Sequence, residues 1–259
     1  MPELPDLQAF RHNLEKALLH KKLESVTVKH AKKLHTTQKA LKEALEGQSL
    51  EHITRVGKEL HFAFKNKHIL GMHLMLHGKL YLFQDKNEEK HTIVELLFAG
   101  GKGLALTDFQ GAANITLDPE EKTAPDALSK AFSESYLEAQ LGKKKTTIKK
   151  FLLDQHNVLG IGNAYADEIL WDARISPFSI CQKIPPAKVK ALYKSIHKIL
   201  ADAEKKILKS HPDIINGEVR DFMLVHNSRL KESPGGAEIK KDTGGGRKTY
   251  YTDEQELFE

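Results

Sequence analysis

A chain of 259 residues, 40% hydrophobic and 29% charged, is long enough for one large domain or two ordinary ones. Its single cysteine, Cys181, excludes an internal disulfide and a multi-cysteine zinc site, and fits a reducing cytoplasm. A formal net charge of +5 favours a polyanionic partner only weakly, although basic runs such as 143–145 concentrate some of the charge. No apolar run approaches the roughly 20 residues that cross a bilayer, so we expect no membrane partner.

The first predicted element is an amphipathic helix over residues 4–18. Leucine and phenylalanine recur every three or four positions between Leu4 and Leu18, which is the spacing of one buried helix face. Pro5 falls where the first turn of a helix tolerates proline, and Asp6 lies near the positive end of the helix dipole. The helix therefore begins almost at the amino terminus.

Strand-like patterns follow from residue 22 to residue 117. Short apolar or alternating runs, broken by Gly, Asn and Asp, include LHFAFKN, HILGMHLML, KLYLFQ and HTIVELLFA. Such runs are typical of an antiparallel β-sandwich or barrel. Residues 1–117 are therefore predicted to form an N-terminal domain made of one helix and a β-sandwich.

Helical patterns replace the strands after LDPEEKTAPDALS, a polar, proline-containing stretch that we interpret as a linker over residues 118–133. Helices are predicted in SYLEAQLG, TIKKFLLDQHNV and NAYADEILWDARI, and in a long run from Pro186 to Ser210. Residues 134–225 then form a helical domain, and the Gly-rich, aromatic tail over 226–259 forms a β-hairpin with a flexible tip. The predicted fold class is α+β.

The opening MPELPD indicates a reactive amino terminus. Initiator methionine is normally removed before a small residue, which would leave Pro2 with a free secondary amine. An α-amino group has a pKa of roughly 7.7 to 8, so part of it is neutral at cellular pH and can attack an aldehyde carbon to form an iminium ion. Glu3 lies beside it and can exchange a proton. The alternative is that Pro2 and Pro5 only stiffen an exposed terminus.

Five segments in chain order carry a resemblance: PELPDLQAF, RVGKELHF, HLMLHGKL, TIKKFLLDQHNVLGIGNAYADEILWDARISP and GGGRKTYY. They resemble the formamidopyrimidine-DNA glycosylase and endonuclease VIII family, and the long segment resembles its helix-two-turn-helix motif. The resemblance spans nearly the whole chain. It implies a bifunctional DNA glycosylase and AP lyase of base excision repair. Such an enzyme excises oxidised pyrimidines or ring-opened purines through a Schiff base on an N-terminal proline and β,δ-elimination.

The implied partner is damaged double-stranded DNA, with the damaged base flipped out of the stack. The resemblance implies a monomer of the bacterial cytoplasm or nucleoid that needs no cofactor, because the amine carries the chemistry. A non-catalytic paralogue that binds damaged DNA is the main alternative, and an RNA-binding protein with a similar helical hairpin is a more distant one. The presence of Pro2, Glu3 and Lys58 favours the enzyme.

The resemblance assigns four residues to catalysis. Pro2 is the nucleophile and Glu3 assists base departure and ring opening. Lys58, within a strand-like pattern, holds the flanking phosphate and supports proton transfer near Glu3. Asp6 occupies the place of a second family glutamate and acts at the ribose or the helix cap, although it is one methylene shorter.

Three further residues match family positions that hold backbone phosphate: Lys149, Asn163 and Arg247. Asn163 follows a glycine-rich turn and is placed to cap the next helix, whose free N–H groups bind phosphate. Lys149 supplies a cation from the partner helix, and Arg247 lies at the tip of the hairpin. Asp167 and Glu168 are interpreted as residues that orient the motif.

Two loops resemble the family's wedge loops but differ in sequence. Leu76 stands where a methionine enters the gap left by the flipped base, and a buried strand leucine is the alternative. The second loop is shortened to DFQG, so Phe109 and Gln110 are the candidates to contact the orphaned base. The Gly-rich loop that covers a flipped purine is missing after VRDFMLVHNSR, which favours the endonuclease VIII side of the family.

The terminal finger also departs from the family pattern, in which four cysteines usually bind zinc. SPGG stands where the first cysteine pair would be, and Thr252 and Gln255 stand where the second would be. His73 and His77 have a ligand-like spacing but lie in a strand-like pattern without a nearby carboxylate. We therefore expect no metal and a zincless finger.

Overall fold

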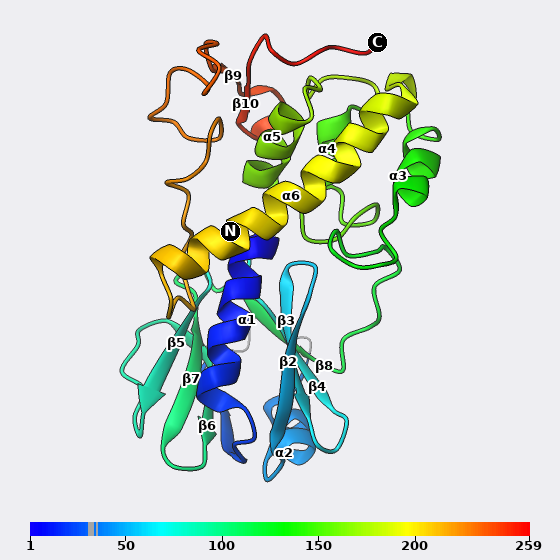
Figure 1. Ribbon diagram of the computed structural model, residues 1–259. Helices are drawn as coiled ribbons and strands as arrows, with labels where there is room; N and C mark the ends of the chain where they lie inside the picture. Colours follow the sequence, from blue (N-terminus) through cyan, green and yellow to red (C-terminus); the bar gives the residue numbers. More distant parts are fainter. Residues whose placement is uncertain (31–33, 35) are drawn as a thin grey trace. The chain divides into compact units, whose positions relative to one another are not determined.

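The computed structural model describes residues 1–30, 34 and 36–259 (Figure 1). Residues 1–121 and 207–218 form one compact unit, and residues 122–206 and 219–259 form another. We call these the first unit and the second unit and describe each by itself. In the part of the chain that the structure describes, no helix is both long and apolar enough to span a bilayer.

The first unit begins with helix α1 (Leu4–Leu18), as the sequence predicts. A reciprocal pair of hydrogen bonds starts this helix, because the Glu3 side chain accepts from the Asp6 backbone and the Asp6 carboxylate accepts from the Glu3 N–H at 2.8 Å. Pro5 occupies the first turn, where its missing N–H costs no hydrogen bond. The caps therefore fix the backbone immediately after Pro2.

Two four-stranded antiparallel sheets follow α1 in the first unit, which confirms the predicted sandwich. One sheet has the order β1-β6-β7-β5 and the other the order β2-β3-β4-β8. The strands are β1 (Leu23–Val28), β2 (Leu50–Val56), β3 (Glu59–Phe64), β4 (Ile69–His73), β5 (Lys79–Gln84), β6 (Thr92–Phe98), β7 (Lys102–Thr107) and β8 (Asn114–Leu117). Figure 1 shows α1 running between the two sheets.

One apolar cluster joins α1 to both sheets. Phe10 and Leu14 of α1, Phe62 of β3 and Leu96 of β6 are fully buried in it. Burial of this kind contributes about 1.5–3 kcal/mol for each large side chain. The cluster therefore fixes where the amino terminus lies on the sandwich.

A short helix, α2 (Gln38–Leu45), lies within residues 22–117, for which the sequence predicts strands only. Thr37 caps it by accepting a hydrogen bond from the Ala40 N–H at 3.1 Å, and Leu41 and Leu45 enter the core. The sequence QKALKEAL consists of good helix formers with one apolar face. The signal was present and was missed because the helix has only 8 residues.

The second unit is helical, as predicted. Its helices are α3 (Glu134–Leu141), α4 (Ile148–Leu153), α5 (Asn163–Asp172), the short 3-10 helix η1 (Cys181–Lys183) and α6 (Pro186–Ser210), whose last turn belongs to the first unit. Helix α5 begins at Asn163, but Gly162 is the N-cap and no side chain caps it. The expectation that Asn163 caps this helix is therefore wrong by one residue.

A two-stranded antiparallel hairpin follows in the second unit, as predicted. It pairs β9 (Lys240–Asp242) with β10 (Thr249–Tyr251), and the glycines of η2 (Gly244–Gly246) form its tip. Tyr250 is buried against the His226 ring, with the ring centroids 4.8 Å apart, and Tyr251 meets Phe178 edge-on at 5.1 Å. Both tyrosines therefore pack the hairpin onto the helices.

Candidate active site and nucleic-acid interface

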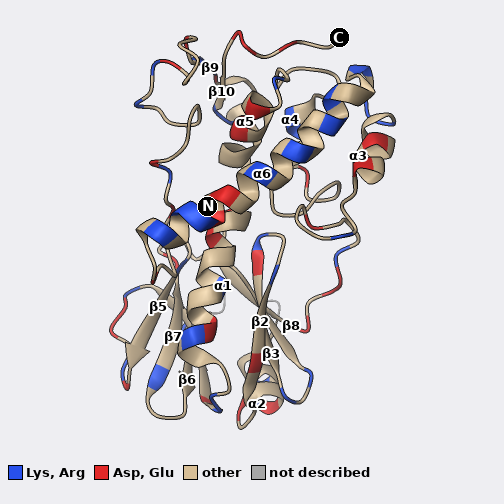
Figure 2. Ribbon diagram, viewed as in Figure 1, with Lys and Arg blue, Asp and Glu red and all other residues tan. Residues whose placement is uncertain are grey.

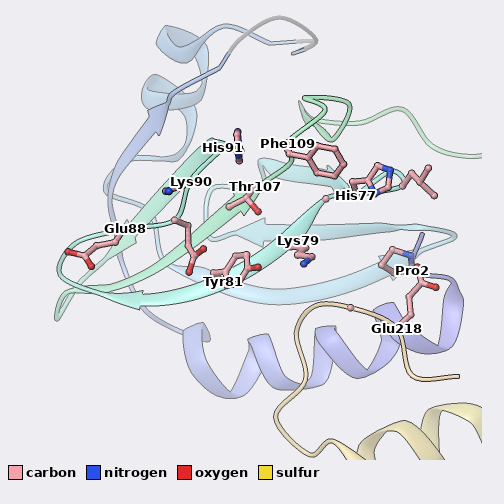
Figure 3. A pocket seen from close by; sticks show the side chains of 14 residues that line it. Pro2, His77, Lys79, Tyr81, Glu88, Lys90, His91, Thr107, Phe109 and Glu218 are labelled. Atoms are coloured by element: carbon pink, nitrogen blue, oxygen red, sulfur yellow. The ribbon is translucent and has the colours of Figure 1, made fainter. Parts of the chain in front are cut away.

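The first unit contains a pocket of about 710 Å³ beside the amino terminus (Figure 3). Pro2, the turn at 76–78, the start of β5, the loop at 88–91, the end of β7 and residues 217–218 line it. A pocket of this volume lies within the range that binds small organic ligands, and it exceeds the size of a single flipped base. The structure thus places Pro2, Leu76 and Phe109 on one cavity.

Pro2 and Glu3 are both buried at the start of α1. Asp6 is fully buried, and its carboxylate accepts the Glu3 N–H as part of the helix cap. Asp6 was expected to act at the ribose or at the helix cap, and the structure shows it at the helix cap. The Met1 amine forms an ion pair with Glu218, which lines the same pocket and lies beside Pro2 in Figure 3.

Lys58 lies in the turn between β2 and β3, which corrects the strand position expected for it. Val56 pairs with Glu59, so Gly57 and Lys58 form a two-residue hairpin loop, and the φ of 58° at Gly57 suits a type II′ turn. Arg55 donates from Nε to Gln8 of α1 at 3.2 Å and from a terminal nitrogen to the Gly57 carbonyl at 3.0 Å. The Arg55 guanidinium therefore fastens this turn to the helix that begins beside Pro2.

Leu76 lies on the exposed turn between β4 and β5, and 60% of its surface is accessible. The Gly78 N–H closes this turn on the Leu74 carbonyl at 2.8 Å, while Leu74 itself is buried. Met75 takes a left-handed φ of 53° and its N–H is accepted by the His73 ring at 2.9 Å. The turn thus presents an apolar side chain to solvent on a fixed backbone.

The loop after β7 is organised by the buried carboxylate of Asp108. This carboxylate accepts backbone N–H groups from Gln110 at 2.9 Å and from Ala112 and Ala113 at 2.8 Å each. Burial by itself raises the pKa of Asp108, but these three hydrogen bonds outweigh it and lower the pKa below its ordinary value of 3.8. Phe109 is 63% exposed on the loop, and its ring lies 4.7 Å from that of His77.

In the second unit, Lys149 of α4 is buried and its amine binds the hairpin. It forms an ion pair with Asp167 of α5 at 2.6 Å and donates to the Thr249 hydroxyl at 2.8 Å and the Lys248 carbonyl at 3.2 Å. Asn163 donates its side-chain N–H to the same Lys248 carbonyl at 2.8 Å. Both residues therefore hold the strand that follows Arg247.

The side chains of Asp167 and Glu168, both on α5, contact the segment at 224–226 that leads towards the hairpin. Asp167 meets His226 Nδ1 at 2.6 Å and accepts the Tyr250 N–H at 2.9 Å. Glu168 accepts backbone N–H groups from residues 224–226 at 2.7–3.1 Å. Burial raises the pKa of Glu168, although these hydrogen bonds oppose the shift. These contacts agree with the orienting role expected for both acids.

A hollow of about 340 Å³ in the second unit is lined by Lys149, Lys150, Phe178 and the exposed Arg247, among others. Figure 2 shows Lys residues recurring along α6 as well. Cations around a concave surface are typical of sites that bind backbone phosphate. The tip of the hairpin and α4 therefore form a candidate phosphate site.

The side chains at the four expected cysteine positions do not fit a zinc ion. Ser233, Thr252 and Gln255 offer hydroxyl and amide groups and Gly236 offers no side-chain ligand, so none supplies the thiolate or imidazole of such fingers. The Ser233 and Thr252 hydroxyls donate to Glu254 at 2.7 Å and 3.1 Å. Among the residues that the structure describes, no group of three or more His, Cys, Asp or Glu is placed to hold a metal ion.

Sequence reasoning missed several residues that line the pocket of the first unit. Lys79 and Tyr81 alternate along β5, so their shared face was readable from the strand pattern. Glu218 carried no such signal, because it lies 216 positions from Pro2. Its segment is tied to α1 and β5 by Asn13, which donates to the Ile214 carbonyl, and by Asn216, which donates to the Leu80 carbonyl, both at 2.9 Å.

Two family models match the chain. One is described as the formamidopyrimidine-DNA glycosylase N-terminal domain and matches residues 1–115, and the other as the formamidopyrimidine-DNA glycosylase H2TH domain and matches residues 123–210. A formamidopyrimidine-DNA glycosylase of Streptococcus pneumoniae is 30% identical, with 97% of each chain covered, and one of Bacillus cereus gives the same values.

Solved structures give the same result. A complex of the Lactococcus lactis Fpg with DNA that contains an abasic site has a TM-score of 0.88 at 28% identity. A complex of the same protein with DNA that contains FAPY-dG has a TM-score of 0.87 at 30% identity. Each match covers 98% of this chain and 100% of the other.

Proposed function

Because the chain belongs to the formamidopyrimidine-DNA glycosylase family, we propose that it removes damaged bases from DNA through a Schiff base on Pro2. The protein is a DNA glycosylase of base excision repair with lyase activity at abasic sites, and its partner is damaged DNA. The observation that carries the proposed mechanism is the position of Pro2, buried at the start of α1 on the wall of the 710 Å³ pocket.

The proposed reaction begins once Met1 has been removed and Pro2 carries a free secondary amine. The amine attacks C1′ of the flipped nucleoside, Glu3 supplies a proton as the base leaves, and the sugar ring opens to an iminium ion. The iminium acidifies the C2′ proton. Loss of that proton expels the 3′ phosphate, and a second elimination expels the 5′ phosphate. Lys58 holds a flanking phosphate from its hairpin turn.

The proposed DNA contacts divide between backbone and base stack. Arg247, Lys149 and Asn163 serve the phosphate backbone, and for the latter two the contacts to Lys248 support an indirect part in placing Arg247. Leu76 enters the gap left by the flipped base, and its exposure on a fixed turn supports this assignment. Phe109 and Gln110 face the orphaned base. The hairpin works without zinc.

The proposed substrates are ring-opened purines and oxidised pyrimidines. The pocket is large for one base and presents both carboxylates, such as Glu88 and Glu218, and cations, such as Lys79 and Lys90. Such a lining accepts bases that carry both donors and acceptors on their exposed edges. The enzyme acts where the chromosome lies, in the bacterial cytoplasm, as a monomer without cofactor.

Borohydride trapping on a duplex with one abasic site tests this mechanism. Borohydride reduces the iminium ion and fixes the enzyme to the DNA, and mass spectrometry of the crosslinked peptide identifies the amine. Lys79 and Lys90 also line the pocket and are the competing amines, so Lys79→Gln and Lys90→Gln are matched controls that should still crosslink. Pro2→Gly should cut trapping sharply. A crosslink on either lysine would refute the assignment of Pro2.

The alternative of a non-catalytic protein that binds damaged DNA gives a different result. It predicts binding to the abasic duplex without any crosslink, in a protein whose measured mass shows that Met1 is absent. A protein that retains Met1 needs the same measurement after methionine removal, because only a free Pro2 amine tests the proposal.

A further inference from the structure

The hairpin of the second unit is fastened to α5 by the carboxylate of Glu254. Its Oε2 atom accepts from the Ser233 hydroxyl at 2.7 Å, the Trp171 Nε1–H at 2.8 Å and the Thr252 hydroxyl at 3.1 Å. Its Oε1 atom forms an ion pair with Arg174 at 2.8 Å. Three donors therefore converge on one oxygen of the ionised carboxylate, and a guanidinium faces the other oxygen.

The donors come from three separate segments of the chain. Trp171 lies in the last turn of α5 and Arg174 just after that helix, Ser233 lies in the loop before β9, and Thr252 follows β10. Ser233, Thr252 and Trp171 are nearly buried, and the Glu254 side chain is 21% exposed. A single anion therefore connects the segments before and after the hairpin to the end of α5.

The loop at 233–237 leaves space for the Glu254 carboxylate. The Ser233 hydroxyl also accepts the N–H groups of Gly235 and Ala237, at 3.2 Å and 3.3 Å. A Cβ atom on Gly235 would collide with Glu254 Oε1, so glycine permits the close approach. The Ser233 hydroxyl thus accepts two N–H groups of its own loop and donates its hydrogen to the Glu254 carboxylate.

The backbone of Arg174 is a second observation that bears on its ion pair with Glu254. It takes a left-handed φ of 57° after α5, a conformation that favours glycine and costs other residues about 1 kcal/mol or more. Its guanidinium lies over the Trp171 ring at 4.7 Å and reaches Glu254. The long charged side chain therefore gains contacts that a glycine at this position would lack.

We propose that Glu254 is a positioning residue for DNA binding, which takes the place of a bound metal ion by joining the Ser233 and Thr252 segments and fixing the hairpin on α5. It acts through Arg247 at the hairpin tip, so the inference rests on the phosphate-binding role proposed above for Arg247. It does not touch the substrate. Losing the carboxylate leaves the chemistry of the first unit intact and weakens the hold on the duplex.

The test uses the full-length protein with Glu254→Gln, which keeps the shape but removes the charge and one acceptor. Amide hydrogen exchange across residues 240–251 should accelerate by about tenfold or more, as expected for lost charge-assisted hydrogen bonds. Affinity for an abasic-site duplex should fall by about tenfold and KM should rise equally, while kcat stays within about twofold. Trp171 is the only tryptophan, so its fluorescence reports this site directly.

Two further variants keep the result interpretable. Asp253→Asn removes the neighbouring carboxylate, which is 77% exposed and pairs with Lys240, and it should leave exchange and affinity unchanged. Arg174→Gly suits the left-handed backbone while removing the ion pair to Glu254, so it should loosen the hairpin without unfolding the unit. Chelators should change neither exchange nor affinity.

Wild-type exchange and wild-type affinity in Glu254→Gln would overturn the proposal. A fall in kcat at unchanged KM would also overturn it, because a positioning residue for binding does not act on the chemical steps. Arg247→Ala separates this failure from a failure of the proposed function. If that variant binds DNA normally, the role of Arg247 is wrong, and the exchange and Trp171 fluorescence measurements alone then decide the role of Glu254.

Discussion

Replacing Asp108 with asparagine is expected to destabilise the first unit and to loosen the loop that carries Phe109 and Gln110. The carboxylate accepts three backbone N–H groups, two of them on Oδ2. An asparagine keeps one oxygen, so at least one N–H faces an amide NH₂ group and loses its acceptor. The remaining hydrogen bonds lose their charge.

The magnitude follows from these contacts. A hydrogen bond to a charged group contributes about 1.5–3 kcal/mol, and a neutral one about 1 kcal/mol. Losing one charged bond and weakening two others costs roughly 3–5 kcal/mol, and the lower cost of burying a neutral amide offsets part of this. We expect a net loss of about 3 kcal/mol, which lowers the Tm of the first unit by roughly 10 °C.

Scanning calorimetry measures this loss, and Trp171 fluorescence identifies the transition of the second unit because the tryptophan lies there. Asp118→Asn is the control, since that carboxylate is 50% exposed and should change stability by under about 1 kcal/mol. The pKa of Asp108 is lowered on folding, so its contribution is present above the ordinary value of 3.8 and is lost as pH falls below it. The difference between wild type and variant should therefore shrink in acid. An unchanged Tm at neutral pH would refute the reasoning.

Other predictions concern chemistry, binding and pH. Glu3→Gln should stop base excision yet spare lyase activity on an abasic duplex, and normal excision in a glycosylase assay would show that Glu3 is not the acid. Leu76→Ser should weaken binding to lesion-containing duplex by roughly tenfold, because a wedge in the stack is lost, while unmodified duplex binds as before. Burial raises the pKa of Cys181 to about 11, so iodoacetamide should label it slowly at pH 8 until the protein unfolds. Hydrogen bonds from Ser233 and Trp171, in that order, are the main causes that lower the pKa of Glu254 from 4.5 to about 2. Its stabilising effect is therefore present above pH 4.5, and Trp171 fluorescence should report its loss only as the pH falls from 4.5 towards 2.

Local elements were readable from the sequence because their signals are local. Helix α1 has its apolar period and its acidic first turn within residues 4–18, and the strand runs of the first unit show their apolar alternation over a few residues each. Helix α2 was missed although its signal was present. The Asn163 cap was misplaced by one residue because element ends depend on a single hydrogen bond.

The partners of charged side chains were not readable in the same way. Lys149 was expected to meet phosphate, and the structure pairs its amine with Asp167 and the hairpin backbone. The phosphate role of Lys149 stays a prediction, and its contact with the Lys248 carbonyl supports a role through placing Arg247. Periodicity reports which face of an element is buried, but it does not report which distant group meets a side chain on that face.

The sequence by itself determined the α+β class, the helix that begins at Leu4 close behind Pro2 and Glu3, and the absence of cysteine ligands in the finger. These depend on residue type and on spacings of a few positions. Only the tertiary structure decided that Glu218 joins the pocket of Pro2, and that Glu254 meets Trp171, Arg174, Ser233 and Thr252. Pro2 and Glu218 are 216 positions apart and Trp171 and Glu254 are 83 apart, so only the packing of whole elements brings them together.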